Sequence, residues 1–304
     1  MTSELRLTVG VTTRNRCESL ERCLRSLGRL HALRPEILVF DDASEDEEAA
    51  PRALAECLGR GRVMRDPGHV GYIVGRNRLV REAGAPFVLL MDDDAALLEV
   101  AAIERALAVL EADPSVIAVG FAQAEADGRA WPARMQPSPL TSAATVRSFI
   151  GFAHIVRREA FLGLGGYREE LVFYGEEKEF CLRALDCGWR VVYLPEALVS
   201  HVPDQRGRDP RRYVRRVILN DCLSALFNEP WPAAAVSVPV RLARFRRMAS
   251  QLDSGDPDGI RWILGQLTAS RRVIRRLRRP VGWRTLGLWW SIGQGRPYAP
   301  PGHP

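Results

Sequence analysis

The sequence is poor in lysine, has no paired cysteines and contains no long apolar run. Lys178 is the only lysine among 43 lysines and arginines. Such uniform use of arginine, together with abundant alanine, is typical of a GC-rich coding sequence and alone indicates little about function. The six cysteines are dispersed without a Cys-x-x-Cys pair, which argues against a disulfide framework or a zinc site. No apolar segment approaches the roughly 20 residues that cross a bilayer. These absences predict a cytoplasmic protein with reduced thiols.

What the sequence does contain is typical of a globular protein with an uneven charge. Its 304 residues are 46% hydrophobic, which is enough for one large domain and an appendage. The net charge is +6, but nineteen arginines and six acidic residues follow residue 205, so the local excess is +13. The rest of the chain is mildly acidic, and no internal repeat is visible.

Apolar runs alternate with helical periodicity over the first 122 residues. The pattern predicts strands at 5–13, 36–42, 62–66, 87–91 and 115–122, and helices near 20–27, 49–59, 72–83 and 99–111. Strands that are apolar on both faces are typical of a mainly parallel sheet covered by helices. We therefore expect an α/β fold.

The second half of the chain begins with a stretch rich in proline and polar residues. We expect a long loop at 123–148, renewed structure at 149–161, a helix at 176–188 and strands at 190–194 and 197–201. Beyond Pro210 only helical patterns are present.

Polar side chains follow four of the predicted strands. The first strand ends in TTRNR, the second in DDASED, the fourth in DDDA and the last in SH. The carboxyl ends of parallel strands meet at one edge of a sheet, where ligands bind. Three adjacent carboxylates are tolerable there if a hard divalent cation and a phosphate lie between them. The alternative for DDDA is a polar turn that caps the next helix.

An ordered series of motifs resembles the inverting family 2 glycosyltransferases of the GT-A fold. The likeness covers roughly residues 7–201 and includes VTTRNR, VFDDASED, GHVGYIVGRN, FVLLMDDDA and GGYREELVFYGEEKEFCLRALDCGWRV. It implies that Mn²⁺ or Mg²⁺ holds a nucleoside-diphosphate sugar, with UDP or dTDP as the favoured carrier. An acceptor hydroxyl would attack the sugar from the opposite face.

The resemblance also implies a domain organisation. A GT-A catalytic domain is expected over 1–205, with a nucleotide-sugar half over about 1–122 and an acceptor half over about 123–205. A basic helical extension is expected over 206–304.

The donor contacts implied by the resemblance fall on six residues, namely Thr13, Asn15, Asp41, Arg76, Asp92 and Asp93. Asp41 would contact the base, Arg76 would neutralise diphosphate charge, and Asp92 would lie at the ribose. Asp93 is the variable middle position of the triplet. Ser44 and Asp46 complete the second motif, although either residue could instead cap the following helix.

By the same resemblance, Asp94 and His201 would ligate the metal and Glu177 would be the general base. Glu176 would position the acceptor or share the role of base. A purely structural role is the alternative for each. Acids in a first helical turn are stabilised by the helix dipole without catalysis, and a single histidine is more often structural.

Three further segments carry predictions about partners. Trp131 and His154 are candidate acceptor contacts, with anchoring of the loop in the core as the alternative for Trp131. The segment 202–212 would close over the diphosphate or serve as a connector. The basic C-terminal helices would pack on the catalytic domain, bind a membrane or bind nucleic acid.

For the charge of these helices we favour anionic lipid at the inner face of the plasma membrane, with Trp283, Trp289 and Trp290 at headgroup level. No nucleic-acid recognition motif is present. The acceptor would be a glycan, a lipid-linked sugar or a small molecule.

Two other functions are compatible with parts of this pattern. A sugar-1-phosphate nucleotidyltransferase would share the sheet and the metal acids, but TTRNRCESL lacks the glycine-rich loop expected after its first strand. A non-catalytic nucleotide-sugar binding protein would not need the acids at 41, 92, 94 and 177.

Overall fold

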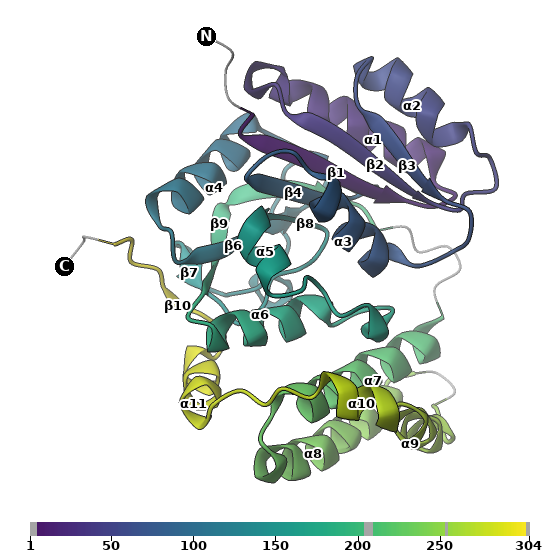
Figure 1. Ribbon diagram of the computed structural model, residues 1–304, viewed down its shortest axis with the longest axis vertical. Coiled ribbons are helices and arrows are strands. Elements are labelled where there is room, and N and C mark those ends of the chain that lie inside the picture. The colour runs from purple at the N-terminus through teal and green to yellow at the C-terminus, as the bar shows by residue number, and fades with distance from the viewer. Residues whose placement is uncertain (1–4, 204–208, 253–254, 302–304) are drawn as a thin grey trace.

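The computed structural model describes residues 5–203, 209–252 and 255–301, and a ten-stranded sheet forms its centre (Figure 1). The strands lie in the order β10-β7-β9-β6-β8-β4-β1-β2-β3, and β5 pairs with β9. Their bounds are β1 (Leu7–Thr13), β2 (Glu36–Asp42), β3 (Arg62–Asp66), β4 (Phe87–Asp92), β5 (Ala95–Leu97), β6 (Val116–Ala124), β7 (Ala144–Thr145), β8 (Ala153–Arg157), β9 (Arg190–His201) and β10 (Arg296–Pro297).

Most strands of this sheet point the same way. β1 runs parallel to β2 and β4, β2 to β3, and β6 to β9, whereas β8 is inserted antiparallel between β4 and β6. Every residue of β1 and β6 is buried, as expected for strands covered on both faces. The mostly parallel sheet is thus confirmed, and it gathers the carboxyl ends of β1, β2, β4, β6 and β9 at one edge.

Helices cover both faces of the sheet. α1 (Cys17–Leu27), α2 (Ala49–Leu58) and α4 (Val100–Ala112) share a core with one face. α3 (Tyr72–Glu82), α5 (Arg158–Gly163) and α6 (Glu176–Asp186) share a core with the other. Short 3₁₀ turns occupy Gly28–Leu33, Ala133–Met135 and Glu169–Leu171.

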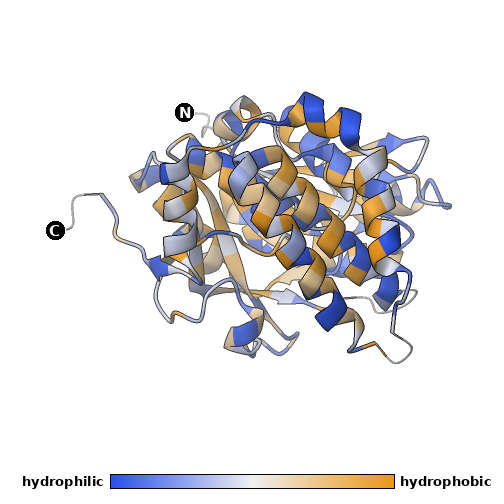
Figure 2. Ribbon diagram, turned by 90° about the horizontal axis from the view of Figure 1, so that it is seen from below, coloured by the Kyte–Doolittle hydropathy of each residue, from blue (hydrophilic) through white to orange (hydrophobic). Residues whose placement is uncertain are grey.

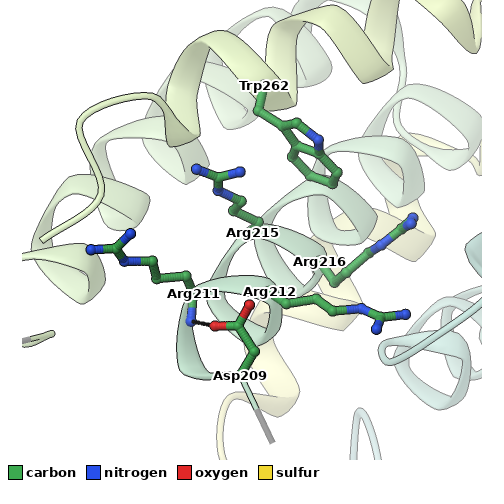
Figure 3. Close-up of a pocket in the computed structure, with 6 residues that line it drawn as sticks. All are labelled: Asp209, Arg211, Arg212, Arg215, Arg216 and Trp262. Carbon is green, nitrogen blue, oxygen red and sulfur yellow. Dashed lines mark hydrogen bonds between the residues drawn. The ribbon is translucent and has the colours of Figure 1, made fainter.

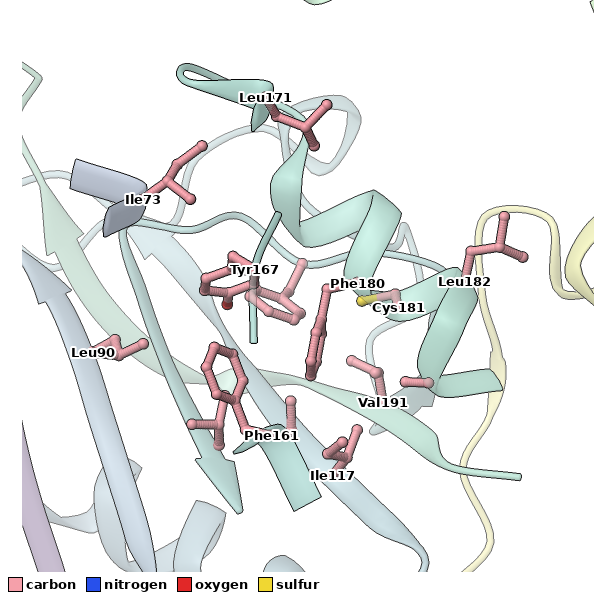
Figure 4. Close-up of a cluster of buried hydrophobic side chains, with 14 of the residues drawn as sticks. Ile73, Leu90, Ile117, Phe161, Tyr167, Leu171, Phe180, Cys181, Leu182 and Val191 are labelled. Atoms are coloured by element: carbon pink, nitrogen blue, oxygen red, sulfur yellow. The ribbon is translucent and has the colours of Figure 1, made fainter. Parts of the chain in front are cut away.

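Aromatic rings fill the space between α6 and the sheet (Figure 4). The ring centroids of Phe161 and Tyr167 are 4.9 Å apart and those of Tyr167 and Phe180 are 5.3 Å apart, both edge to face. Such pairs add to the stabilisation that comes from burial. They fix α6 with its N-terminus at the edge where the strand ends meet.

The C-terminal helices are α7 (Pro210–Asn228), α8 (Trp231–Ala249), α9 (Gly259–Ala269), α10 (Arg271–Leu277) and α11 (Trp283–Ile292). Of these helices, α7 and α11 pack on α6, and α8, α9 and α10 pack against α7 (Figure 1). Ile218, Phe227 and Phe245 are buried in the same core as Phe180. Hydrophobic and hydrophilic residues alternate along the helices seen from below (Figure 2). Because many of the hydrophobic ones are buried in this core, packing accounts for many of the apolar residues on these helices.

The predictions about a membrane concern the length of the helices and the exposure of three tryptophans. Within residues 5–203, 209–252 and 255–301, none of the helices combines the length and the apolar composition that a bilayer crossing requires. Trp283 and Trp290 are exposed, but Trp289 is only 7% exposed. The prediction that Trp289 reaches headgroup level is therefore wrong, because its ring belongs to the core.

The structure corrects the predicted elements at several places. The strands predicted at 190–194 and 197–201 form one strand, β9, whose pairing with β6 shifts in register between Leu194 and Leu198. β5, which was not predicted, follows the aspartate triplet, and β7 interrupts the predicted loop. β10 shows that the chain beyond Pro210 is not entirely helical. Residues 204–208 of the predicted closing segment lie outside the described residues, and 210–212 already belong to α7.

Candidate active site

The aspartate triplet lies where β4 turns into β5. β5 runs antiparallel to β9, and this pairing places Ala95 opposite His201. As a result Asp94 Oδ1 lies 3.5 Å from His201 Nε2. The backbone thus brings together the two residues predicted to ligate a metal.

The imidazole of His201 is held in one orientation. Its Nδ1 lies 2.7 Å from Gln123 Oε1, which can only accept, so Nδ1–H donates to that oxygen and Nε2 faces Asp94. The ring lies between Phe152 and Trp131, with centroid distances of 4.7 and 5.8 Å and nearly parallel planes. A histidine whose second nitrogen donates to an oxygen is typical of metal ligation. A carboxylate oxygen and an imidazole nitrogen suit Mn²⁺ or Mg²⁺ as a partial donor set.

The protein supplies only part of a coordination sphere. No group of three His, Cys, Asp or Glu side chains within the described ranges is placed to hold a metal. Any cation at Asp94 and His201 would need further ligands from a bound molecule or from water, as Mg²⁺ in substrate-phosphate sites commonly has.

The middle aspartate, Asp93, faces the protein. Thr13 Oγ1 donates to Asp93 Oδ2 at 2.8 Å, and Arg16 Nη1 lies 2.9 Å from Asp93 Oδ1 and 3.2 Å from Asp94 Oδ2. Burial raises the pKa of Asp93 to about 7, against the opposing effect of the Arg16 charge. Asp93 and Thr13 therefore tie the end of β1 to the triplet.

Arg76 joins the triplet to the acids of α6. Its Nη2 donates to Asp92 Oδ1 at 2.7 Å and to the Gly151 carbonyl at 2.8 Å, and its Nη1 donates to Glu176 Oε1 at 2.8 Å. The guanidinium is 2% exposed. These contacts differ from the predicted diphosphate contact, because the charge of Arg76 is already balanced by protein carboxylates inside the fold.

Glu176 and Glu177 begin α6 and occupy different environments. Glu176 is fully buried and accepts from Tyr72 Oη at 3.0 Å as well as from Arg76. The Glu177 side chain is 16% exposed, with Oε1 3.7 Å from Arg76 Nη1. Burial raises the pKa of both carboxyls, and the adjacent charge of Glu176 raises the pKa of Glu177 further. Glu177 is thus the more accessible acid of the pair.

The segment before α6 has an unusual backbone. Val172 and Tyr174 adopt φ values of 62° and 68°, and Gly175 precedes the helix at 85°. Asn220 of α7 donates through Nδ2 to the carbonyls of Leu171, Phe173 and Tyr174. Non-glycine residues in this conformation cost energy and gather at functional sites. The hydrogen bonds from Asn220 stabilise the strained segment, so α7 helps to hold the following Glu177 in place.

The predicted base-binding acid, Asp41, is covered in this structure. It is fully buried and is bound by Ser44 N at 3.0 Å, by the Ser44 hydroxyl and by Arg65. The side-chain oxygen of Asn15 accepts from Glu45 N at 2.8 Å, and the backbone N–H of Asn15 donates to Ser44 Oγ at 2.9 Å. The ends of β1 and β2 therefore form one hydrogen-bonded unit.

Asp46 does not cap α2, because the N-cap of that helix is Glu48 and it has no side-chain cap hydrogen bond; Asp46 stabilises the turn just before the helix. Its carboxylate accepts from Glu48 N at 3.0 Å and pairs with Arg52 at 2.9 Å, at the start of α2. Ser44 serves Asp41 and Asn15 instead.

The two candidate acceptor contacts lie in different environments. Trp131 is half-buried against His201 at the site. His154 is fully buried, with Nε2 2.7 Å from Tyr167 Oη. The structure therefore places His154 in the core and does not support its prediction as an acceptor contact.

Several site residues were not predicted from the sequence. Arg16, Arg65, Gln123 and Gly151 all contact candidate site residues. Arg16 and Gln123 lie at strand ends, which is a usable signal. Gly151 lies in a stretch without any motif, and its role depends on contacts with residues distant in sequence.

Comparison with known proteins gives a family match over the first half of the chain. The family described as Glycosyl transferase family 2 matches residues 8–164. An N-acetylglucosaminyl-diphospho-decaprenol L-rhamnosyltransferase of Mycobacterium tuberculosis is 26% identical over 234 residues, which cover 64% of this chain and 76% of that protein.

Solved structures show the same fold. The structure of GalNAc-T7 with UDP, GalNAc and Mn²⁺ has a TM-score of 0.62 at 17% identity, covering 89% of this chain and 58% of that chain, so this chain spans less than two thirds of that protein. The mannosyltransferase PcManGT from Pyrobaculum calidifontis, solved with GDP-Man and Mn²⁺, has a TM-score of 0.57 at 17% identity, covering 96% and 85%. The fold is GT-A, and the family match spans more than half of the sequence. The chain belongs to glycosyl transferase family 2.

Proposed function

We propose that this protein is a divalent-cation-dependent inverting glycosyltransferase that moves a sugar from a nucleoside-diphosphate sugar to an acceptor hydroxyl. The observation that supports this most is the bridge made by Arg76. One buried guanidinium binds Asp92 beside the candidate metal pair and Glu176 beside the candidate base. A fixed distance between donor and base is what a single displacement requires.

On the donor side, the three aspartates of the triplet differ in the exposure of their side chains. Side-chain exposure is 31% for Asp92 but 4% for Asp93 and 5% for Asp94. Asp92 is therefore the acid available to a ribose hydroxyl, while Asp94 and His201 would hold Mn²⁺ or Mg²⁺. The bound cation would neutralise the diphosphate as it leaves. The carrier in our proposal is UDP or dTDP, and its nucleoside part would lie at the hydrogen-bonded unit formed by the ends of β1 and β2.

On the acceptor side, Glu177 would take the proton of the attacking hydroxyl. A carboxylate with a raised pKa is a stronger base, and Glu177 is the more exposed member of its pair. Arg76 and Tyr72 would hold Glu176 ionised beside it. Trp131 offers an aromatic face for a sugar ring next to His201.

For the acceptor we favour a lipid-linked sugar over a soluble glycan. The mycobacterial relative is named for a diphospho-decaprenol acceptor. The C-terminal helices carry a strong positive charge, which favours contact with an anionic membrane surface. Exposed Trp283 and Trp290 suit the headgroup region of such a membrane.

The test of the chemical role compares Glu177→Gln with Glu176→Gln. The first variant keeps the shape of the side chain but cannot accept a proton. We expect sugar transfer to fall by about 10² or more while donor affinity is retained. Near-normal transfer by Glu177→Gln together with loss in Glu176→Gln would assign the base to Glu176.

A further inference from the structure

A hollow of about 460 Å³ lies between α7 and α9, and none of its lining residues belongs to the candidate active site (Figure 3). We call it the basic groove. Its lining consists of Asp209, Arg211, Arg212, Arg215, Arg216 and Trp262. Four positive side chains thus share one small space with a single acid.

The four arginines lie on the first turns of α7 as two pairs spaced i,i+4, Arg211 with Arg215 and Arg212 with Arg216. Arg215 donates from Nε and Nη2 to the two carboxylate oxygens of buried Asp256, at 2.7 and 2.6 Å. Arg212 and Arg216 are spaced i,i+4, and neither has an acidic partner within the described part of the chain. Figure 3 shows both side chains extending to the same side of α7. Like charges at this spacing destabilise a helix, so the fold leaves this pair without the neutralisation it gives Arg215.

Trp262 holds the neighbouring guanidiniums in place. The guanidinium carbons of Arg215 and Arg216 lie 5.7 and 5.5 Å from the centre of its ring. Arg216 is half-buried, and its pKa is lowered by burial and then by the charge of Arg212. Stacking on an aromatic ring fixes a planar donor group before a ligand arrives.

Asp209 does not cancel this charge. Its carboxylate caps α7 by accepting from Arg211 N at 2.9 Å. An anion would therefore meet Arg212 and Arg216 without displacing an ion pair of either residue with any acid in residues 5–203, 209–252 or 255–301.

We propose that the basic groove binds a phosphate or diphosphate group through Arg212 and Arg216. Planar guanidiniums bind phosphate oxygens in pairs, with charge-assisted hydrogen bonds. Such a group could be carried by an anionic lipid headgroup or by a soluble molecule.

The helix that lines the groove contacts the segment that precedes the proposed base. Tyr213, between the two arginines in sequence, has its ring centre 4.9 Å from that of Tyr174, which precedes Glu176 and Glu177 by two and three residues. A lipid phosphate in the groove would thus anchor the membrane or a phosphate-bearing acceptor close to the base. This consequence rests on the proposed function, whereas the anion site itself does not.

The test is calorimetric titration of the full chain with inorganic pyrophosphate in EDTA, which prevents metal-dependent binding at Asp94 and His201. We expect binding to weaken by at least about tenfold in the double variant Arg212→Gln and Arg216→Gln, because two charge-assisted contacts are lost. The matched control is Arg246→Gln with Arg247→Gln, which removes the same charge from exposed positions of α8 and should bind as wild type does. Arg212→Gln alone, at an exposed position, guards against misfolding of the double variant.

A second arm measures sedimentation with phosphatidylcholine vesicles, with and without phosphatidic acid. If the double variant loses binding only to vesicles with phosphatidic acid, the ligand is a lipid headgroup. If it also loses binding in the pyrophosphate titration, a soluble anion suffices as ligand. Equal losses in the groove variant and the α8 control would overturn the proposal, because the charge would then act diffusely. The absence of groove-dependent binding in both arms would overturn it as well.

Discussion

Gly151 controls how closely the acid cluster can approach β8. A methyl group at this position would lie 2.0 Å from Glu177 Oε1 and 2.7 Å from Arg76 Nη1. Both atoms end flexible side chains, so the fold can yield by moving them. We expect Gly151→Ala to reduce sugar transfer by about 10², because displacing a catalytic group by about 1 Å has that effect, with little change in melting temperature. Steady-state kinetics and thermal unfolding measure the two quantities.

The control for this substitution is Gly163→Ala at the end of α5. An added methyl group there has no neighbour within 4 Å, so both activity and stability should be retained. Full activity in Gly151→Ala would contradict the placement of Glu177 against Arg76.

His154 makes stability depend on pH. Burial lowers its pKa well below the usual value of 6.5, so the folded state keeps His154 neutral while the unfolded state takes up a proton. Above about pH 6.5 neutral His154 costs the folded state no proton. As the pH falls below that value, the free energy of unfolding declines by about 1.4 kcal/mol per pH unit, because the unfolded state binds one more proton. Urea unfolding of wild type and His154→Gln at pH 5.5 and 7.5 measures this difference. An identical pH dependence in both proteins would contradict the account of His154.

At the scale of elements, α7 links the C-terminal helices to the site. Asn220 satisfies three carbonyls of the strained segment before α6. We expect Asn220→Ala to lower the free energy of unfolding by about 1–3 kcal/mol and to lower kcat about tenfold. Donor affinity should be unchanged, because the candidate metal pair, Asp94 just before β5 and His201 at the end of β9, lies away from this segment. Urea unfolding, kinetics and donor titration separate these effects.

Asn228→Ala is the matched control on the same helix. Asn228 is fully buried and donates to Glu179 Oε1 at 3.0 Å, away from the strained segment. A similar loss of stability with normal kcat is expected. If both variants lost the same activity, α7 would act through stability alone.

The elements that were predicted correctly are those set by local pattern. β1, β2 and β4 are continuous apolar runs, and α1 buries Leu20, Cys23, Leu24 and Leu27 at helical spacing. β5 and β10 are only three and two residues long, so their existence depends on the strand they pair with. A pattern within either segment could not reveal it.

At the scale of the whole molecule, the sequence indicated which strand ends would meet, but not how their side chains would be partnered. Asp94 and His201 meet because β5 pairs with β9. The coverage of Asp41 by Arg65 and the balance of Arg76 by two acids depend on tertiary packing. Motif and strand order therefore predicted which residues come together, and tertiary packing decided which of their charges are paired inside the protein.

The central claim, a metal-dependent nucleotide-sugar site formed by distant strands, is tested most directly by titrating UDP into the protein with Mn²⁺ and with EDTA. We predict that Mn²⁺ strengthens binding at least about tenfold and that Asp94→Ala abolishes this difference. Asp46→Ala, which removes an exposed carboxylate at the start of α2, should retain it. Unchanged affinity and unchanged dependence on Mn²⁺ in a folded Asp94→Ala variant would contradict the account.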